Sequence, residues 1–208
     1  MGSKYDAKNI TNVGKAIRHY VKKKQFFYAE ADIEKQKVFS EKLGKIDPSK
    51  LRALDETRIE NNMVNNFAYS PKGKRAHCVK KAITSQSVSL IASMKIGDSS
   101  TSLRAPFAFE GTLNRPVFET YLEQVLIPDL TPGEVILMDN YSPHKGERIE
   151  QLIKAAGCEI LYTPPYSPHL NPIEHLWSPL KYKLKQILEY VTNNVYEALE
   201  YFFDKKSI

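Results

Sequence analysis

Val135-Ile136-Leu137-Met138-Asp139-Asn140 reads as a buried strand that ends in an acid. Four consecutive apolar residues are typical of a strand covered on both faces, so Asp139 stands where the chain leaves the sheet. A lone buried carboxylate is costly, and Asp139 therefore needs water, a partner or a cation. The alternative is that Asp139 simply starts the turn that follows, and this run alone does not decide between the two.

A second acid follows another short apolar run. Asp55 ends Leu51-Arg52-Ala53-Leu54 and is followed at once by Glu56. Neighbouring side chains on a strand point to opposite faces, so only one of these two acids can face a shared site. We favour Asp55 because it follows the apolar pair Ala53-Leu54 directly.

Glu174 is the third acid, near the start of a predicted helix. One interpretation is structural: Asn171 is the N-cap, Pro172 is N1 and Glu174 closes a capping box at N3. The helix pattern favours a functional role. Its apolar seam is Ile173, Leu176, Trp177, Leu180, Leu184 and Ile187. Glu174, Lys181 and Lys185 share a flanking face within about 40° of one another, which suits a carboxylate for metal beside lysines for phosphates.

Oxygen ligands from Asp55, Asp139 and Glu174 would select Mg²⁺, or Mn²⁺ in its place, over zinc. Two such ions about 4 Å apart can activate an attacking oxygen and stabilise a leaving one in phosphodiester chemistry. His144, His169 and His175 lack zinc-site spacing, and structural roles are expected for them. His144 is the candidate exception because it lies just beyond Asp139.

The net charge of +6 is concentrated at one end of the chain. Residues 1–50 hold 12 Lys and Arg against 6 Asp and Glu, whereas residues 51–208 hold 18 of each. A basic arm, with Lys22, Lys23 and Lys24 at its end, suits contact with a polyanion such as DNA, although a solvated lysine surface is the simpler alternative. No stretch approaches the about 18 apolar residues of a membrane span. Cys78 and Cys158 suggest no disulfide framework, so an intracellular location is expected.

The order of predicted elements indicates one α/β domain with a mixed sheet. A helix from the N-cap Asp32 to Gly44 precedes three strands that read as an antiparallel meander, and helices and strands then alternate. We therefore divide the chain into a basic arm with a linker helix, residues 1–48, and a catalytic domain, residues 49–208. The predicted strands lie at 51–57, 88–94, 103–109, 135–139 and 159–162, and the later helices at about 114–126, 147–156, 174–187 and 196–203.

Three sequence blocks resemble the catalytic blocks of DDE-superfamily transposases of the mariner-like and related bacterial insertion-sequence type. They are Leu54-Asp55-Glu56-Thr57, Met138-Asp139-Asn140-Tyr141-Ser142-Pro143-His144-Lys145, and Pro164-Pro165-Tyr166-Ser167-Pro168-His169-Leu170-Asn171-Pro172-Ile173-Glu174-His175-Leu176-Trp177. The 34 residues between Asp139 and Glu174 match the usual gap in that group. The resemblance covers about residues 20–190.

The resemblance implies an RNase H-like fold, flanked by helices, in which Asp55, Asp139 and Glu174 bind two Mg²⁺ ions. Such enzymes cut double-stranded DNA at transposon ends and use the freed 3′-hydroxyl to attack target DNA, commonly as homodimers. A bacterial member would work in the cytoplasm or nucleoid. The family usually has helix-turn-helix domains ahead of the core, whereas only about 25 residues precede the linker here, with residues 13–20 resembling the tail of a last DNA-binding helix.

Two other functions remain compatible with the sequence. The chain could be a non-catalytic remnant that binds DNA or an intact transposase. It could also be an RNase H-like nuclease that cleaves without strand transfer. All three acids are present, which favours the catalytic interpretation.

Overall fold

The computed structural model describes residues 29–63, 69–77, 86–97 and 102–204, and its framework is a five-stranded mixed sheet. The strands are β1 (Leu51–Glu60), β2 (Ser87–Lys95), β3 (Arg104–Glu110), β4 (Val135–Met138) and β5 (Glu159–Tyr162). Their spatial order is β3-β2-β1-β4-β5. The first three are antiparallel neighbours, while β4 and β5 run parallel to β1, as the order of elements predicts.

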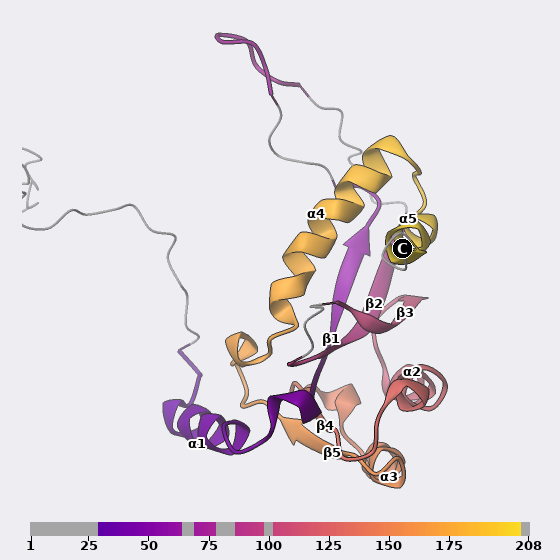
Figure 1. Ribbon diagram of the computed structural model, residues 1–208. Coiled ribbons are helices and arrows are strands. Elements are labelled where there is room, and N and C mark those ends of the chain that lie inside the picture. The colour runs from indigo at the N-terminus through magenta and orange to yellow at the C-terminus, as the bar shows by residue number, and fades with distance from the viewer. Residues whose placement is uncertain (1–28, 64–68, 78–85, 98–101, 205–208) are drawn as a thin grey trace, which may run out of the picture.

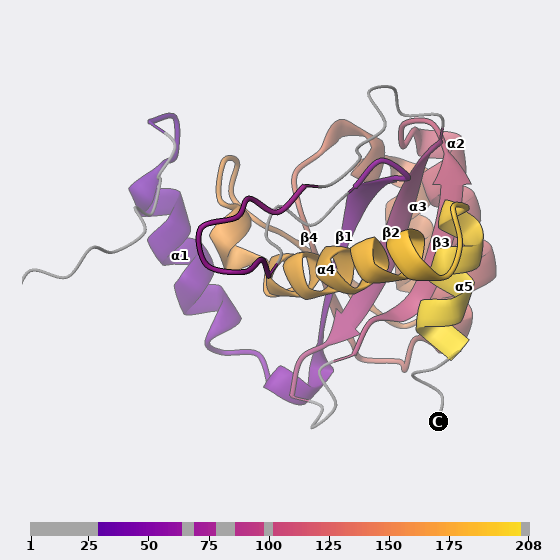
Figure 2. The ribbon, with the colours of Figure 1, turned by 90° about the horizontal axis from the view of Figure 1, so that it is seen from above.

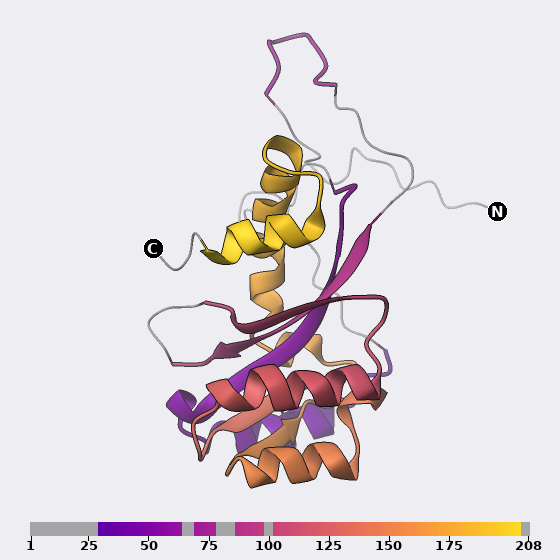
Figure 3. The same ribbon diagram turned by 90° about the vertical axis from the view of Figure 1, so that its right-hand side faces the viewer.

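Helices cover both faces of the sheet (Figure 1). α4 (Glu174–Tyr190) and α5 (Val195–Asp204) lie on one face, and α2 (Arg115–Tyr121) and α3 (Glu147–Ala155) on the other, as Figure 3 shows. α1 (Ile33–Leu43) lies to one side of the sheet, where Figure 2 shows it apart from the other helices. None of the described helices is long and apolar enough to cross a bilayer.

The predicted element boundaries agree closely with the structure. The Asp32 side chain accepts hydrogen bonds from the backbone N–H groups of Glu34 and Lys35, so it caps α1 as expected. Asn114 caps α2 in the same way, and α2 continues through a π-helical turn over Leu122–Leu126. Among the described residues Cys158 is a free, buried thiol, whereas Cys78 lies outside them.

Side chains on β1 alternate between two hydrophobic cores. Ala53 and Ile59 point toward α4 and α5, whereas Leu54 points toward α2 and α3. The first core also contains Val88, Leu90, Ala92, Met94, Leu103, Ile173, Trp177, Leu180, Leu184, Leu188, Val195, Ala198 and Leu199. The second contains Ile91, Leu113, Phe118, Tyr121, Leu122, Leu126, Ile136, Met138, Ile149, Ile153 and Cys158. The apolar seam predicted for α4 is therefore its core face.

β1 runs on past the end of its parallel neighbour. It pairs with β2 from Arg52 to Glu60, but its pairing with β4 stops where Ala53 meets Leu137. Beyond Ala53 the two strands separate, and the edge of β1 that faced β4 needs other hydrogen-bond partners. Open strand ends of this kind are where α/β folds gather ligand-binding groups.

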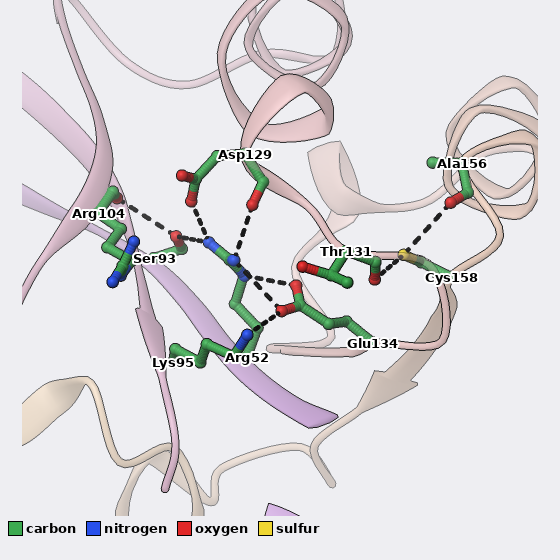
Figure 4. Close-up of polar contacts among 9 residues, drawn as sticks. All are labelled: Arg52, Ser93, Lys95, Arg104, Asp129, Thr131, Glu134, Ala156 and Cys158. Atoms are coloured by element: carbon green, nitrogen blue, oxygen red, sulfur yellow. Dashed lines mark hydrogen bonds and ion pairs between the residues drawn. The ribbon is translucent and has the colours of Figure 1, made fainter. Parts of the chain in front are cut away.

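A buried ionic cluster lies at the other end of β1 (Figure 4). The Arg52 side chain is almost fully buried, and its guanidinium donates to Glu134 Oε2 at 2.9 Å, to the Asp129 carbonyl at 2.9 Å and to the Asp129 carboxylate. Lys95 Nζ lies 2.9 Å from Glu134 Oε1. These contacts join β1 and β2 to the segment that leads into β4, and the guanidinium also reaches Ser93 Oγ at 3.2 Å.

We predict that Glu134→Gln lowers the free energy of unfolding by about 3 kcal/mol, because it leaves the buried Arg52 charge undercompensated. Urea unfolding followed by circular dichroism measures this. The matched control is Glu123→Gln, which breaks an exposed pair with Arg148 and should cost less than about 1 kcal/mol. Equal losses in the two variants would contradict a stabilising role for the buried cluster.

Candidate active site

The three predicted acids come from three separate elements and meet at the open end of β1. Asp55 lies on β1, Asp139 is the residue after β4, and Glu174 is the first residue of α4. Besides burial, the negative charge of Glu174 raises the pKa of Asp55, and that of Asp139 raises the pKa of Glu174. Each effect requires two carboxylates that are near each other, so Glu174 lies near both Asp55 and Asp139.

Asp55 is half-buried, and its side chain points toward α4. The indole N–H of Trp177 donates to Asp55 Oδ2 at 2.9 Å. Burial raises the pKa of Asp55 to about 7, the indole hydrogen bond opposes that shift, and the Glu174 charge adds to it. Asp55 is therefore a carboxylate whose charged form needs more support than Trp177 alone supplies.

Asp139 is held by a buried histidine. His144 Nδ1 lies 2.6 Å from Asp139 Oδ1, and the backbone N–H of Tyr141 donates to the same oxygen at 3.1 Å. Burial opposes ionisation of Asp139, but the His144 ring outweighs it, so the pKa of Asp139 falls below its usual value. The His144 side chain is 1% exposed and packs against the Phe118 ring, with centroids 4.5 Å apart.

Glu56 completes this chain of contacts. Its Oε2 lies 3.2 Å from His144 Nε2, an ion-pair distance without good hydrogen-bond geometry. Burial lowers the pKa of His144, but the carboxylates of Asp139 and Glu56 together raise it to about 9. His144 is therefore a buried imidazolium between two carboxylates. Asp55 and Glu56 lie on opposite faces of β1, as strand alternation predicts, but nothing in the local sequence indicates that Glu56 is linked to Asp139 through His144.

The capping-box interpretation of Glu174 is wrong. α4 begins at Glu174 itself, with Ile173 as the N-cap residue and no side-chain cap. Asn171 instead donates its side-chain amide to the Leu54 carbonyl at 3.0 Å, because that carbonyl lies just beyond the last β1–β4 pair. The Glu174 carboxylate is thus left for the site, where partial desolvation raises its pKa and Lys181 opposes the shift.

The donor set fits hard divalent cations. Burial, and then the charge of a neighbouring carboxylate, raises the pKa of Asp55 and that of Glu174, so a nearby positive charge would stabilise both groups, and oxygen ligands suit Mg²⁺ or Mn²⁺. The buried Asn171 Oδ1 has no hydrogen-bond partner among the described residues, although the amide nitrogen of the same side chain donates to the Leu54 carbonyl. Within that part of the chain no three His, Cys, Asp or Glu side chains already form a metal cluster, so cation binding requires the carboxylates to move closer together.

The predicted DNA-binding lysines are placed only in part. Lys181 lies close enough to Glu174 to influence its ionisation, and Lys185 follows one turn later on α4. Both are half-buried. Lys22, Lys23 and Lys24, together with the helical tail expected over 13–20, lie outside the described residues.

Known proteins share this sequence pattern and fold. The profile of the DDE superfamily endonucleases matches residues 50–193. The Tcb1 transposase of Caenorhabditis briggsae is 31% identical over 106 residues, which cover 49% of this chain and 39% of that protein. The Tc1 transposase of Caenorhabditis elegans is 32% identical over 68 residues, 33% of this chain and 25% of that protein. The chain therefore spans less than half the length of these curated relatives.

Solved structures agree on the fold. The Mos1 transposase paired-end complex with left transposon end superposes with a TM-score of 0.64 at 14% identity, covering 95% of this chain and 62% of that one. The catalytic domain of Mos1 mariner transposase gives 0.53 at 14% identity, covering 87% and 84%. The RNase H-like prediction is confirmed. The chain belongs to the DDE superfamily of endonucleases and carries a transposase catalytic domain of the DDE type.

Proposed function

We propose that this chain is the catalytic core of a transposase that hydrolyses DNA phosphodiester bonds at transposon ends and joins the freed 3′-hydroxyl to target DNA. The observation that supports the proposal is the placement of the three acids: Asp55 and Asp139 each lie two residues beyond the last β1–β4 pair, and Glu174 is the first residue of α4. Residues 49–208 form the catalytic unit in this proposal, and residues 1–48 the basic arm and linker helix.

In this proposal the three acids hold two Mg²⁺ ions, for which Mn²⁺ substitutes. Bound there, the ions would activate the attacking oxygen and stabilise the leaving one in an in-line phosphoryl transfer. The protein's part is to position charge. His144 and the Tyr141 backbone N–H keep the Asp139 carboxylate ionised and oriented. Trp177 orients one oxygen of Asp55 and offsets part of the effect of burial on its pKa.

The proposed partner is double-stranded DNA, bound by a homodimer in the active complex. Solved Mos1 complexes include a transposon end, and others contain Mn or Mg, which supports the same partners for this chain. Lys181 and Lys185 continue from Glu174 along α4 and would contact phosphates beside the cleavage site. Lys22, Lys23 and Lys24 would add contacts that do not depend on DNA sequence.

We predict that the purified protein nicks supercoiled DNA in the presence of Mn²⁺ and that Asp139→Asn lowers the rate by more than about 100-fold, the upper end of the cost of losing a supporting residue. An agarose-gel nicking assay measures this. Glu150→Gln, an exposed carboxylate change on α3, is the control and should retain activity. Equal nicking by the Asp139→Asn variant would refute the assignment of Asp139.

Strand transfer separates the transposase from a nuclease or an inactive remnant. With DNA that carries candidate terminal repeats, we expect joined products that form from the 3′-hydroxyl and disappear in Glu174→Gln. Labelled oligonucleotides resolved on denaturing gels detect those products. Cleavage of RNA–DNA hybrids without joining would indicate the nuclease, and DNA binding without either reaction would indicate the remnant.

Replacing Lys181 and Lys185 together by alanine should weaken DNA binding and reduce the salt dependence of log Kd by about 1 to 2, because each phosphate contact releases about one counterion. Fluorescence anisotropy between low and moderate salt measures the slope. Lys183→Ala is the matched control, since Lys183 is exposed on the same helix but about 180° from Glu174. An unchanged slope in the double variant would remove these lysines from the DNA interface.

A further inference from the structure

Two side chains on either side of Glu174 attach its helix to the strand that carries Asp55. Asn171, three residues before Glu174, donates to the Leu54 carbonyl at 3.0 Å. Trp177, three residues after Glu174, donates to Asp55 Oδ2 at 2.9 Å. The two acceptors belong to neighbouring residues on β1. Two hydrogen bonds, one from each side of Glu174 in the sequence, therefore end on neighbouring residues of β1.

The Asn171 contact is buried and the Trp177 contact is partly buried, which makes both costly to lose. Asn171 is 2% exposed, Trp177 is 5% exposed and Leu54 is fully buried. A buried donor or acceptor left without a partner keeps the full cost of its desolvation. β4 no longer pairs with β1 beyond Ala53, so the Leu54 carbonyl depends on a partner from elsewhere in the chain. Asn171 is that partner.

The choice of tryptophan is more specific than core packing requires. Position 177 belongs to the apolar face of α4, where a phenylalanine or leucine would fill the same core. The indole adds an N–H that needs a partner when buried, and the acceptor here is a carboxylate of the site. A hydrogen bond to a charged acceptor is stronger than a neutral one, and it fixes the direction of the Asp55 side chain.

Together the two bonds determine how α4 sits on β1. A shift of α4 by one residue would rotate the helix by about 100°. Asn171 and Trp177 would then lose their acceptors, and Glu174 would be displaced. We propose that Trp177 and Asn171 are positioning residues: they orient the Asp55 carboxylate and hold the helix that carries Glu174 against β1, so that a divalent cation can draw the two carboxylates together. The part of this inference that concerns metal affinity rests on the proposed function.

Trp177 supplies its own spectroscopic signal, because it is the only tryptophan in the sequence. A negative charge beside the indole N–H stabilises the excited state and shifts its emission to longer wavelength. Asp55→Asn should therefore shift the emission of the metal-free protein to shorter wavelength. Asp129→Asn, which removes a carboxylate from the ionic cluster at the other end of β1, is the control and should leave the emission unchanged.

Metal affinity provides the second measurement. We expect Trp177→Phe and Asn171→Ala each to weaken Mg²⁺ binding by about 10-fold in calorimetry, the usual effect of losing a residue that orients a metal ligand. Leu184→Val, a change in the same core without a polar contact, should bind Mg²⁺ like the unmodified chain. Mg²⁺ added to the unmodified protein should also shift the tryptophan emission to shorter wavelength.

The outcomes separate this inference from the proposed function. Unchanged emission in Asp55→Asn, or unchanged Mg²⁺ affinity in a folded Trp177→Phe variant, would overturn the positioning role while DNA cleavage by the unmodified chain stands. Should Trp177→Phe fail to fold, the emission of Asp55→Asn and the affinity of Asn171→Ala decide the question. A chain that binds no Mg²⁺ and cuts no DNA, yet shows the Asp55→Asn shift, would overturn the proposed function and retain the Trp177 contact.

Discussion

The cost of holding three partly buried carboxylates as anions is the constraint on which this site depends. Burial disfavours the ionised forms of Asp55 and Glu174, and the charge of Glu174 adds to the cost at Asp55 as that of Asp139 does at Glu174. Positively charged groups and hydrogen-bond donors from several elements offset part of this cost. His144 and a backbone N–H support Asp139, Trp177 supports Asp55, and Lys181 lies near Glu174. The negative charge that these donors do not offset would attract cations to the site.

The three acids are not supported equally. Asp139 has an imidazolium and a backbone donor, and the pKa of its carboxyl is lowered. Asp55 has only neutral donors, the Trp177 indole and the Glu56 backbone N–H, and burial raises its pKa to about 7. Asp139 is therefore ready as an anion before any cation arrives, whereas Asp55 gains most from one. This asymmetry follows from position, because Asp139 lies beyond the end of β4 and Asp55 lies inside the longer β1.

Local pattern was enough to predict most elements and to select three candidate acids. An acid directly after an apolar run indicated Asp139. Strand alternation allowed only one of Asp55 and Glu56 to face a shared site, and the preceding apolar pair Ala53-Leu54 favoured Asp55. Sequence could not predict the contacts that bring the acids together, because they join residues far apart in the chain. Asn171 meets Leu54 across 117 positions and Trp177 meets Asp55 across 122. Asn171 precedes a proline, which is typical of an N-cap, but that assignment is wrong. The Asn171 side-chain amide instead donates to the Leu54 carbonyl, which β4 does not pair. Trp177 fits the apolar seam of α4, so nothing in the sequence indicated that its indole N–H makes a specific hydrogen bond.

The anchoring of β1 has a consequence for how the chain can change length. Arg52 points into the ionic cluster on one side of the sheet, and Asp55, three residues later, points to the helix on the other. Side chains alternate along a strand, so adding or deleting one residue between them would send one anchor into the wrong face. The residues between Arg52 and Asp55 can be substituted, but their number cannot change. Members of the lineage should therefore vary in the connections between strands while this interval stays the same length.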